Sequence, residues 1–264
     1  MVAGMSTWVL DLDGVVWRGD RIVDGSDRAV SALLAAGHQV VACTNHAQSP
    51  AVKGRTLARL GVPEIPVVTS AEAAASRCPE GSSVLVLGDE SLVAVIAASG
   101  LEAIDVFDLP DGSVPRVDVV VVGGTHRWDR SRVGMAAAAV RLGALFLATN
   151  DDPTYPVCGP DGDRLLPGNG ALVAAVATTA EVAAEVTGKP HPAMVQLLQE
   201  RFGQVDVVVG DKADTDGELA LRLGARFALV LSGVTGPDSL PVRPSPSWIA
   251  PDLATLVHIV GSVG

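Results

Sequence analysis

Carboxylate, hydroxyl and ammonium side chains occur at four places where the chain leaves or enters an apolar segment. The first place is the segment WVLDLDG (8–14), in which two carboxylates interrupt an apolar run. A charge inside such a run costs free energy unless something pairs with it or uses it. Each place alone is typical of a turn, a helix cap or a surface lysine, but their combination and order indicate chemistry. The residues are Asp11, Asp13, Thr44, Asn45, Lys189 and Asp211.

Phosphoryl transfer is the chemistry that this set of residue types suits. It needs a metal to neutralise charge and donors for the phosphate oxygens, and a carboxylate nucleophile can split the reaction into two easier steps. Asp11 and Asp211 are hard oxygen ligands of the kind that Mg²⁺ takes. Thr44 offers a hydroxyl donor and Lys189 a positive charge. Asp13 is then a candidate general acid and base.

The elements that must position these residues alternate along the chain. Apolar, β-branched runs each end in a polar or glycine cluster, and Ala/Leu-rich segments of helical length, such as 26–37 and 215–225, separate them. This alternation predicts an α/β fold with a parallel sheet, and ligands bind beyond the carboxyl ends of such strands. The expected strands are 8–14, 39–45, 83–90, 118–125, 144–150, 206–212 and 226–233.

Proline and glycine clusters indicate where the chain breaks. The segment SRCPEGSS (76–83) precedes a new series of strands and helices, and VTGKPHP (186–192) precedes a helix. The segments 108–116 and 150–170 are predicted loops, and the second is long enough to be functional.

The motifs in this order resemble the haloacid dehalogenase (HAD) superfamily, subgroup IIA, which includes NagD-type, 4-nitrophenyl and phosphoglycolate phosphatases. The resemblance extends from residue 8 to about 235 and implies a Rossmann-like parallel-sheet core with an inserted α/β cap of the C2 type. The core would comprise residues 1–77 and 185–264, and the cap residues 78–184. The motifs are DLDGVVW, TNHAQSP, GKPHPAM, VGDKADTDGELALRLGARFALVLSGVT, LATNDDPTYPV and LLPGNGALVAAV.

The resemblance also implies roles for the acidic residues. Asp11 would be the nucleophile and a Mg²⁺ ligand, and Asp13 would be the acid/base and contribute its backbone carbonyl to the metal. Asp211 would be a further Mg²⁺ ligand. Asp216 would orient a water molecule on that metal.

The phosphate-binding groups implied by the resemblance are Thr44, the backbone N–H of Asn45, and Lys189. The sequence departs from the family at His46, where relatives carry a second Asn, and in the cap segment VVGGTHRWDRSRV, where they carry an acidic residue. Side chains at such places are candidates for substrate specificity: His46, His126, Arg127 and Trp128. Asn150, in the cap motif LATNDDPTYPV, is a further candidate.

The function that follows is Mg²⁺-dependent hydrolysis of a small phosphorylated metabolite through an aspartyl-phosphate. A phosphotransferase or mutase that uses the same intermediate stays open, as does a non-catalytic sensor of phosphorylated metabolites. A dehalogenase is disfavoured, because halide leaves without protonation and would give Asp13 no role.

Composition limits the partners and the location. The chain has 264 residues and a net charge of −11, which disfavours nucleic acid as a partner. Its three cysteines are scattered, as expected of a reducing compartment. No apolar stretch approaches the ~20 residues that span a bilayer. The sequence therefore predicts a cytoplasmic protein, monomeric or homodimeric, with no membrane partner.

Overall fold

The computed structural model describes residues 4–157 and 164–261. Its contacts divide the chain into two compact units. The first contains residues 1–44, 50–68 and 194–264, and the second contains residues 45–49 and 69–193. Among the helices of the described residues, none combines the length and the apolar character needed to cross a bilayer.

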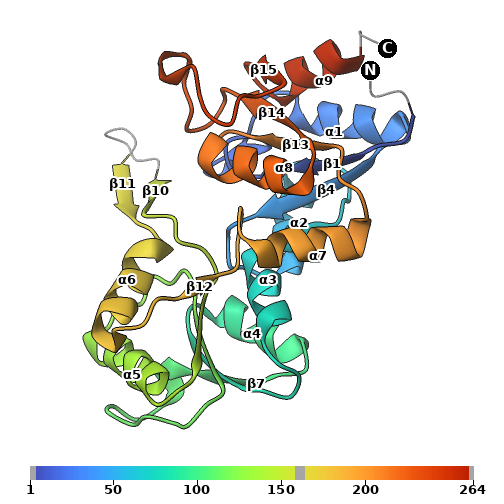
Figure 1. The fold of residues 1–264 in the computed structure, drawn as a ribbon. Helices are drawn as coiled ribbons and strands as arrows, with labels where there is room; N and C mark the ends of the chain where they lie inside the picture. Colours follow the sequence, from blue (N-terminus) through green and yellow to red (C-terminus); the bar gives the residue numbers. More distant parts are fainter. Residues whose placement is uncertain (1–3, 158–163, 262–264) are drawn as a thin grey trace. The chain divides into compact units, whose positions relative to one another are not determined.

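The first unit is built on a six-stranded parallel sheet (Figure 1). Strand β1 is paired with β13 on one side and with β4 on the other, so the strand order reverses between β1 and β13. Apart from the edge strand β15, each strand is a short run of mostly buried apolar residues, as expected when helices cover both faces of a parallel sheet. The strand order is β15 (Trp248–Ala250), β14 (Arg226–Val230), β13 (Val207–Gly210), β1 (Thr7–Leu10), β4 (Gln39–Thr44) and β5 (Val67–Thr69).

One face of this sheet packs against α1 and α9, which contribute Val30 and Leu253 to the core. A short hairpin of β2 (Trp17–Arg18) and β3 (Arg21–Ile22) follows β1, and a one-turn π-helix (Ala213–Gly217) follows β13. The helices of this unit are α1 (Ser26–Ala35), α2 (Pro50–Arg59), α7 (Pro192–Phe202, which begins in the second unit), α8 (Glu218–Leu223), α9 (Leu253–Gly261) and the 3₁₀ turn Pro237–Ser239.

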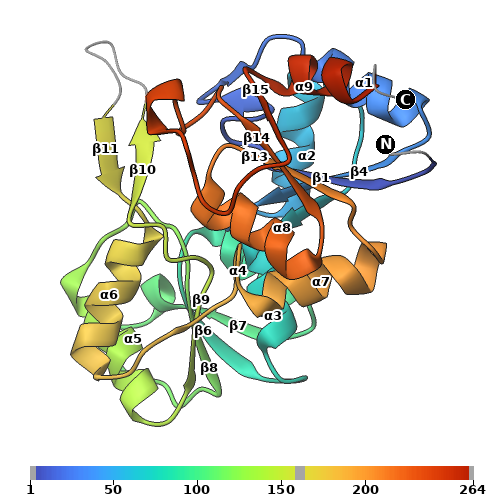
Figure 2. The ribbon, with the colours of Figure 1, turned by 45° about the horizontal axis from the view of Figure 1, so that its top comes forward.

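The second unit has its own five-stranded parallel sheet, enclosed by helices on both faces (Figure 2). Alternate residues of its strands face α5 and α6 on one side and α3 and α4 on the other. The sheet order is β12 (Glu185–Val186), β9 (Leu145–Ala148), β8 (Val119–Val122), β6 (Ser83–Leu87) and β7 (Glu102–Asp105). The helices are α3 (Ser70–Arg77), α4 (Glu90–Ala98), α5 (Arg130–Arg141), α6 (Asn169–Ala180) and the 3₁₀ turn Val106–Asp108.

The predicted α/β class with parallel strands is confirmed, and all seven expected strands are present. The prediction of a loop over 150–170 is wrong in part. Strands β10 (Thr154–Val157) and β11 (Arg164–Pro167) form an antiparallel pair there, and α6 begins at Asn169. The polar, proline-containing sequence concealed this pair, because both strands are largely exposed and carry no apolar alternation.

Candidate active site

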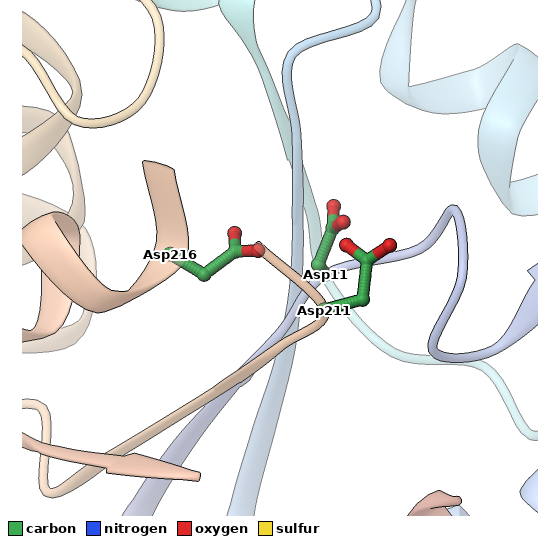
Figure 3. Close-up of side chains that lie close together, drawn as sticks. All are labelled: Asp11, Asp211 and Asp216. Carbon is green, nitrogen blue, oxygen red and sulfur yellow. The ribbon is translucent and has the colours of Figure 1, made fainter. Parts of the chain in front are cut away.

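Three carboxylates of the first unit come together beyond the carboxyl ends of β1 and β13. Asp11 follows β1, Asp211 follows β13, and Asp216 belongs to the π-helix. One oxygen of each lies within 4.8 Å of those of the other two (Figure 3). Since the strand order reverses between β1 and β13, the cluster occupies the switch point at which α/β sheets bind ligands.

Backbone N–H groups hold two of these carboxylates in place. Oδ2 of Asp211 accepts a hydrogen bond from the N–H of Val234 at 2.6 Å, and Oδ2 of Asp216 accepts one from Lys212 at 3.2 Å. Gly14 packs against Asp211 with φ at +83°. A side chain there would overlap the Asp211 carboxylate, so the motif needs glycine at this position.

The cluster fits a hard divalent cation. Asp211 is 3% and Asp216 1% exposed, and ionised carboxylates this close together and this poorly hydrated repel one another. The three side chains offer carboxylate oxygens, and oxygen is the donor that Mg²⁺ and Ca²⁺ prefer. The side chain of Asp216 lies in the same cluster as Asp11 and Asp211, so it is a candidate ligand itself as well as the predicted orienting group.

Asp13 has different surroundings from Asp11. Its Oδ1 accepts a hydrogen bond from the indole N–H of Trp17 at 2.9 Å. The Nζ of Lys53, on α2, lies 5.5 Å from the centroid of the Trp17 ring. Burial lowers the pKa of Lys53, while the charges of Asp13 and Asp11 act in the opposite direction. The Asp13 carboxylate, the Trp17 indole and the buried Lys53 ammonium group therefore form a continuous chain of contacts.

Thr44 is the last residue of β4, the strand next to β1, and is buried. Its place at the carboxyl end of the central strands agrees with the position predicted for it. Thr44, Asp11 and Asp211 therefore lie at the carboxyl ends of β4, β1 and β13, which are consecutive strands of one sheet. Asp216 lies in the π-helix that follows β13.

Asn45 and Lys189 are joined in the second unit. The Asn45 amide contacts both backbone groups of Lys189: its Oδ1 accepts the N–H at 2.7 Å, and its Nδ2 donates to the carbonyl oxygen at 3.1 Å. Gly188 approaches so closely that an added Cβ would lie 2.6 Å from Asn45 Oδ1 and would overlap the carbonyl oxygen of Thr149. The position of Lys189 in this unit therefore depends on Asn45 and on a glycine before it.

Asn150 is part of the same network. Its Nδ2 donates to the Asn45 carbonyl oxygen at 2.8 Å, which also accepts a hydrogen bond from the Ser70 hydroxyl at 2.7 Å. The Asn45 side chain in turn donates to Asp152 at 3.2 Å. Asn150 is a predicted candidate for substrate specificity, and in the structure its side chain holds the backbone of Asn45.

The other candidates for substrate specificity lie in exposed positions. His46 is exposed, and Trp128 is 49% exposed with its indole N–H donating to the Thr125 carbonyl oxygen at 3.1 Å. Arg127 stacks over Phe107, with 3.9 Å from Cζ to the ring centroid, and hydrogen-bonds to Asp105 at 3.3 Å. His126 and Arg127 border a shallow depression of about 260 Å³, whose other lining residues are Asp89, Glu90 and Ser91.

Sequence reasoning missed Lys53 and Ser70. The signal for Lys53 was present, because it lies four residues before the buried Leu57 and so shares its face of α2. A lysine on the apolar face of a helix is unusual and could have been singled out. Ser70 has no comparable signal, because its partner is a backbone carbonyl 25 positions away.

Two family models match the chain. The model described as haloacid dehalogenase-like hydrolase matches residues 8–102, and one described as HAD-hydrolase-like matches residues 186–256. Asp11, Asp13, Thr44 and Asn45 fall within the first match, and Lys189 and Asp211 within the second.

Several characterised proteins are similar to the chain over most of its length. The D-glycerol 3-phosphate phosphatase of Mycobacterium tuberculosis is 36% identical over 260 residues, which cover 94% of this chain and 70% of the relative. Mouse chronophin (Mus musculus) is 36% identical over 252 residues, which cover 89% of this chain and 84% of the relative.

A solved structure shares the fold. The crystal structure of a glycerol phosphate phosphatase from M. tuberculosis in complex with magnesium matches with a TM-score of 0.82 and 34% identity. The match covers 96% of this chain and 76% of that one. The order of motifs, the fold and the carboxylate cluster thus all point to the same family of hydrolases.

Proposed function

Because the chain belongs to the family of haloacid dehalogenase-like hydrolases, we propose that it hydrolyses small phosphomonoesters with Mg²⁺ through a phosphorylated Asp11. It is an enzyme of the phosphatase class. The observation that carries the proposal is the cluster of Asp11, Asp211 and Asp216 at the switch point of the sheet. Asp13, two residues after Asp11, accepts a hydrogen bond from the Trp17 indole instead of joining the cluster.

The reaction has two steps in which the chain's own groups change. In the first, an Asp11 carboxylate oxygen forms a bond to phosphorus while the bond from phosphorus to the alcohol oxygen breaks, and Asp13 gives its proton to that oxygen. In the second, a water molecule gives a proton to Asp13 and attacks phosphorus. The bond between phosphorus and Asp11 breaks, and inorganic phosphate leaves.

Asp11, Asp211 and Asp216 would hold the metal with their side chains, and Asp13 would add its backbone carbonyl. Bound Mg²⁺ supplies neutralisation of the negative charge that otherwise opposes attack of a carboxylate on a phosphate dianion. The cation also relieves the repulsion among the three clustered carboxylates.

Thr44, the backbone N–H of Asn45, and Lys189 are the proposed phosphate-binding groups. Support comes from their chemistry and from the contacts that hold them. Thr44 is the last residue of the buried strand β4, and the Asn45 side chain holds the Lys189 backbone by hydrogen bonds. A lysine ammonium is a compact positive charge that suits a phosphate oxygen.

The substrate class we propose is a small phosphorylated metabolite. Glycerol 3-phosphate is the first compound to test, because a glycerol phosphate phosphatase is among the relatives that cover most of this chain. We propose His46, His126, Arg127 and Trp128 as residues that select among such esters, because His46 and the cap segment 123–130 are where the sequence departs from the family pattern.

Three further predictions accompany this function. We propose a core of residues 1–77 and 185–264 with a cap of residues 78–184. We propose a cytoplasmic location, which the free cysteines Cys43 and Cys78 support. The oligomeric state is predicted as monomer or homodimer.

The test is release of inorganic phosphate from a panel of phosphomonoesters, with Mg²⁺ or with a chelator, by wild type and Asp11→Asn. Turnover that requires both the metal and Asp11 is expected, and the preferred ester identifies the substrate class. Alcohol released in excess over phosphate, with an added alcohol becoming phosphorylated, would show a phosphotransferase instead. Chelator-resistant turnover, or turnover by a folded Asp11→Asn variant, would contradict the proposal.

A further inference from the structure

Lys53 is an ammonium group buried within α2. It is 6% exposed and lies on the same face of the helix as Leu57. Burying a lysine costs free energy that a leucine or methionine at the same position would avoid. A charge retained at this cost calls for a functional reason.

The surroundings of Lys53 provide that reason. Its Nζ lies 5.5 Å from the centroid of the Trp17 ring, within the range of a cation–π interaction. The indole N–H of the same ring donates to Oδ1 of Asp13 at 2.9 Å. Trp17 is itself 3% exposed. All three residues belong to the first unit, so the chain of contacts lies within one compact body.

We propose that Lys53 is a positioning residue, which holds the Trp17 indole so that its N–H fixes the carboxylate of Asp13 for proton transfer to the leaving group. The inference rests on the proposed function, because it gives Lys53 a role through Asp13. A cation over the ring also polarises the indole, which strengthens the N–H as a donor. A positioned acid contributes most when the leaving group is a poor one.

Kinetics with two esters test this role. On an alkyl phosphate, Lys53→Met and Trp17→Phe should each lower kcat about tenfold, a modest share of the effect of a general acid. On 4-nitrophenyl phosphate, whose leaving group needs little protonation, the loss should stay below about twofold. Lys53→Arg should retain most of the activity on both esters, because a guanidinium also binds over an aromatic ring.

The double variant Lys53→Met/Trp17→Phe tests whether Lys53 acts through Trp17 or whether the two residues act independently. Because Lys53 acts through Trp17, the double variant should be no slower than Trp17→Phe alone. Arg55→Met is the matched control, since it removes one positive charge from an exposed position on the same helix. It should leave both esters unaffected.

A second measurement does not depend on turnover. The protein has four tryptophans, so its ¹H–¹⁵N spectrum contains four indole signals, and Trp17→Phe identifies the one from Trp17. In Lys53→Met this signal should shift and exchange faster with solvent, while the other three stay in place. If wild type fails to hydrolyse any ester, the proposed function is wrong, and this spectrum still decides whether Lys53 holds Trp17.

Three outcomes would overturn the inference. The first is an equal loss of kcat on both esters, and the second is a rise in KM alone, which would place Lys53 in phosphate binding. The third is an unchanged Trp17 signal in Lys53→Met.

Discussion

At the scale of single residues, the surroundings of Asp11 and Asp13 distinguish two chemically identical side chains. Asp11 lies beside two further carboxylates, an arrangement that favours a bound divalent cation. The Asp13 carboxylate accepts a hydrogen bond from the indole N–H of Trp17, whereas the charge of the buried Lys53 ammonium acts on both Asp13 and Asp11. The carboxylate neighbours of Asp11 and the indole neighbour of Asp13 support the roles proposed above, nucleophile for Asp11 and general acid and base for Asp13.

The first prediction concerns the proton that Asp13 carries. Asp13→Asn should lower kcat on alkyl phosphates by about 10²- to 10⁴-fold, because asparagine cannot donate a proton to the alcohol oxygen. The loss on 4-nitrophenyl phosphate should be much smaller. The measurement is kcat for both esters, with circular dichroism to confirm folding. Equal losses would show that Asp13 is not the acid.

A second prediction concerns Gly188. Gly188→Ala places a methyl group against Asn45 Oδ1 and the Thr149 carbonyl, so the Asn45 contact with the Lys189 backbone should be lost. A displacement of about 1 Å in a catalytic group can cost ~10²-fold, and we expect a loss of that order in kcat/KM. Gly236→Ala, where a Cβ meets no atom within 4 Å, is the control and should behave as wild type. Activity of Gly188→Ala at the wild-type level would contradict the role of this contact.

At the scale of elements, the strand ends explain what the sequence could predict. Apolar runs located all seven strands, but the expected ranges ran past the true ends by up to four residues, as at 8–14 against Thr7–Leu10. The reason is that the polar residues after each run lie beyond the last residue of the strand, and those after β1 and β13 belong to the candidate site. The same fact made the candidate residues predictable, since each follows a recognisable strand or motif.

Contacts between distant elements could not be predicted. The hydrogen bonds between the Asn45 side chain and the Lys189 backbone span 144 positions, and the hydrogen bond from the Ser70 hydroxyl to the Asn45 carbonyl oxygen spans 25. The pair of β10 and β11 was missed because most of its residues are exposed. When a side chain bonds to a backbone atom, the partner can be any residue type. The sequence therefore gives no sign of which residue the partner is.

The third prediction belongs to the end of α3. Burial raises the pKa of the Cys78 thiol to about 11 from its ordinary value of 9.0. The folded state therefore keeps the proton where the unfolded chain loses it, and this contribution to stability is present below pH 9 and is lost as the pH rises towards 11. The difference in Tm between wild type and Cys78→Ala should be constant below pH 9 and shift against wild type above it. A difference independent of pH would contradict the buried thiol.

At the scale of the whole molecule, folding brings the two halves of the metal cluster together. Asp11 lies near the start of the chain. Asp211 and Asp216 lie about 200 residues later, in the segment that follows β13, the strand that pairs with β1. Assembly of the sheet therefore creates the cluster, and the repulsion among its carboxylates opposes folding when no cation is present. Stability and metal binding are thus linked.

The fourth prediction follows from this linkage. Mg²⁺ binds the folded state, so it should raise the Tm of wild type with increasing concentration, by an amount that follows RT ln(1 + [Mg²⁺]/Kd). Asp211→Asn should abolish the rise, and it should also raise the Tm without metal because one repelling charge is removed. Asp238→Asn, on the exposed 3₁₀ turn, is the control and should keep the wild-type response. A metal-independent Tm would count against the cluster as a cation site.

The most direct test of the central claim is a search for the phosphorylated Asp11. Enzyme with Mg²⁺ is mixed with a phosphoryl-labelled ester and quenched in acid within milliseconds, and the labelled peptide is identified by mass spectrometry. We predict a label on the peptide that contains Asp11, sensitive to hydroxylamine as acyl phosphates are, and none in Asp11→Asn. Turnover of the ester with no label at any quench time, or a label on another residue, would contradict the account.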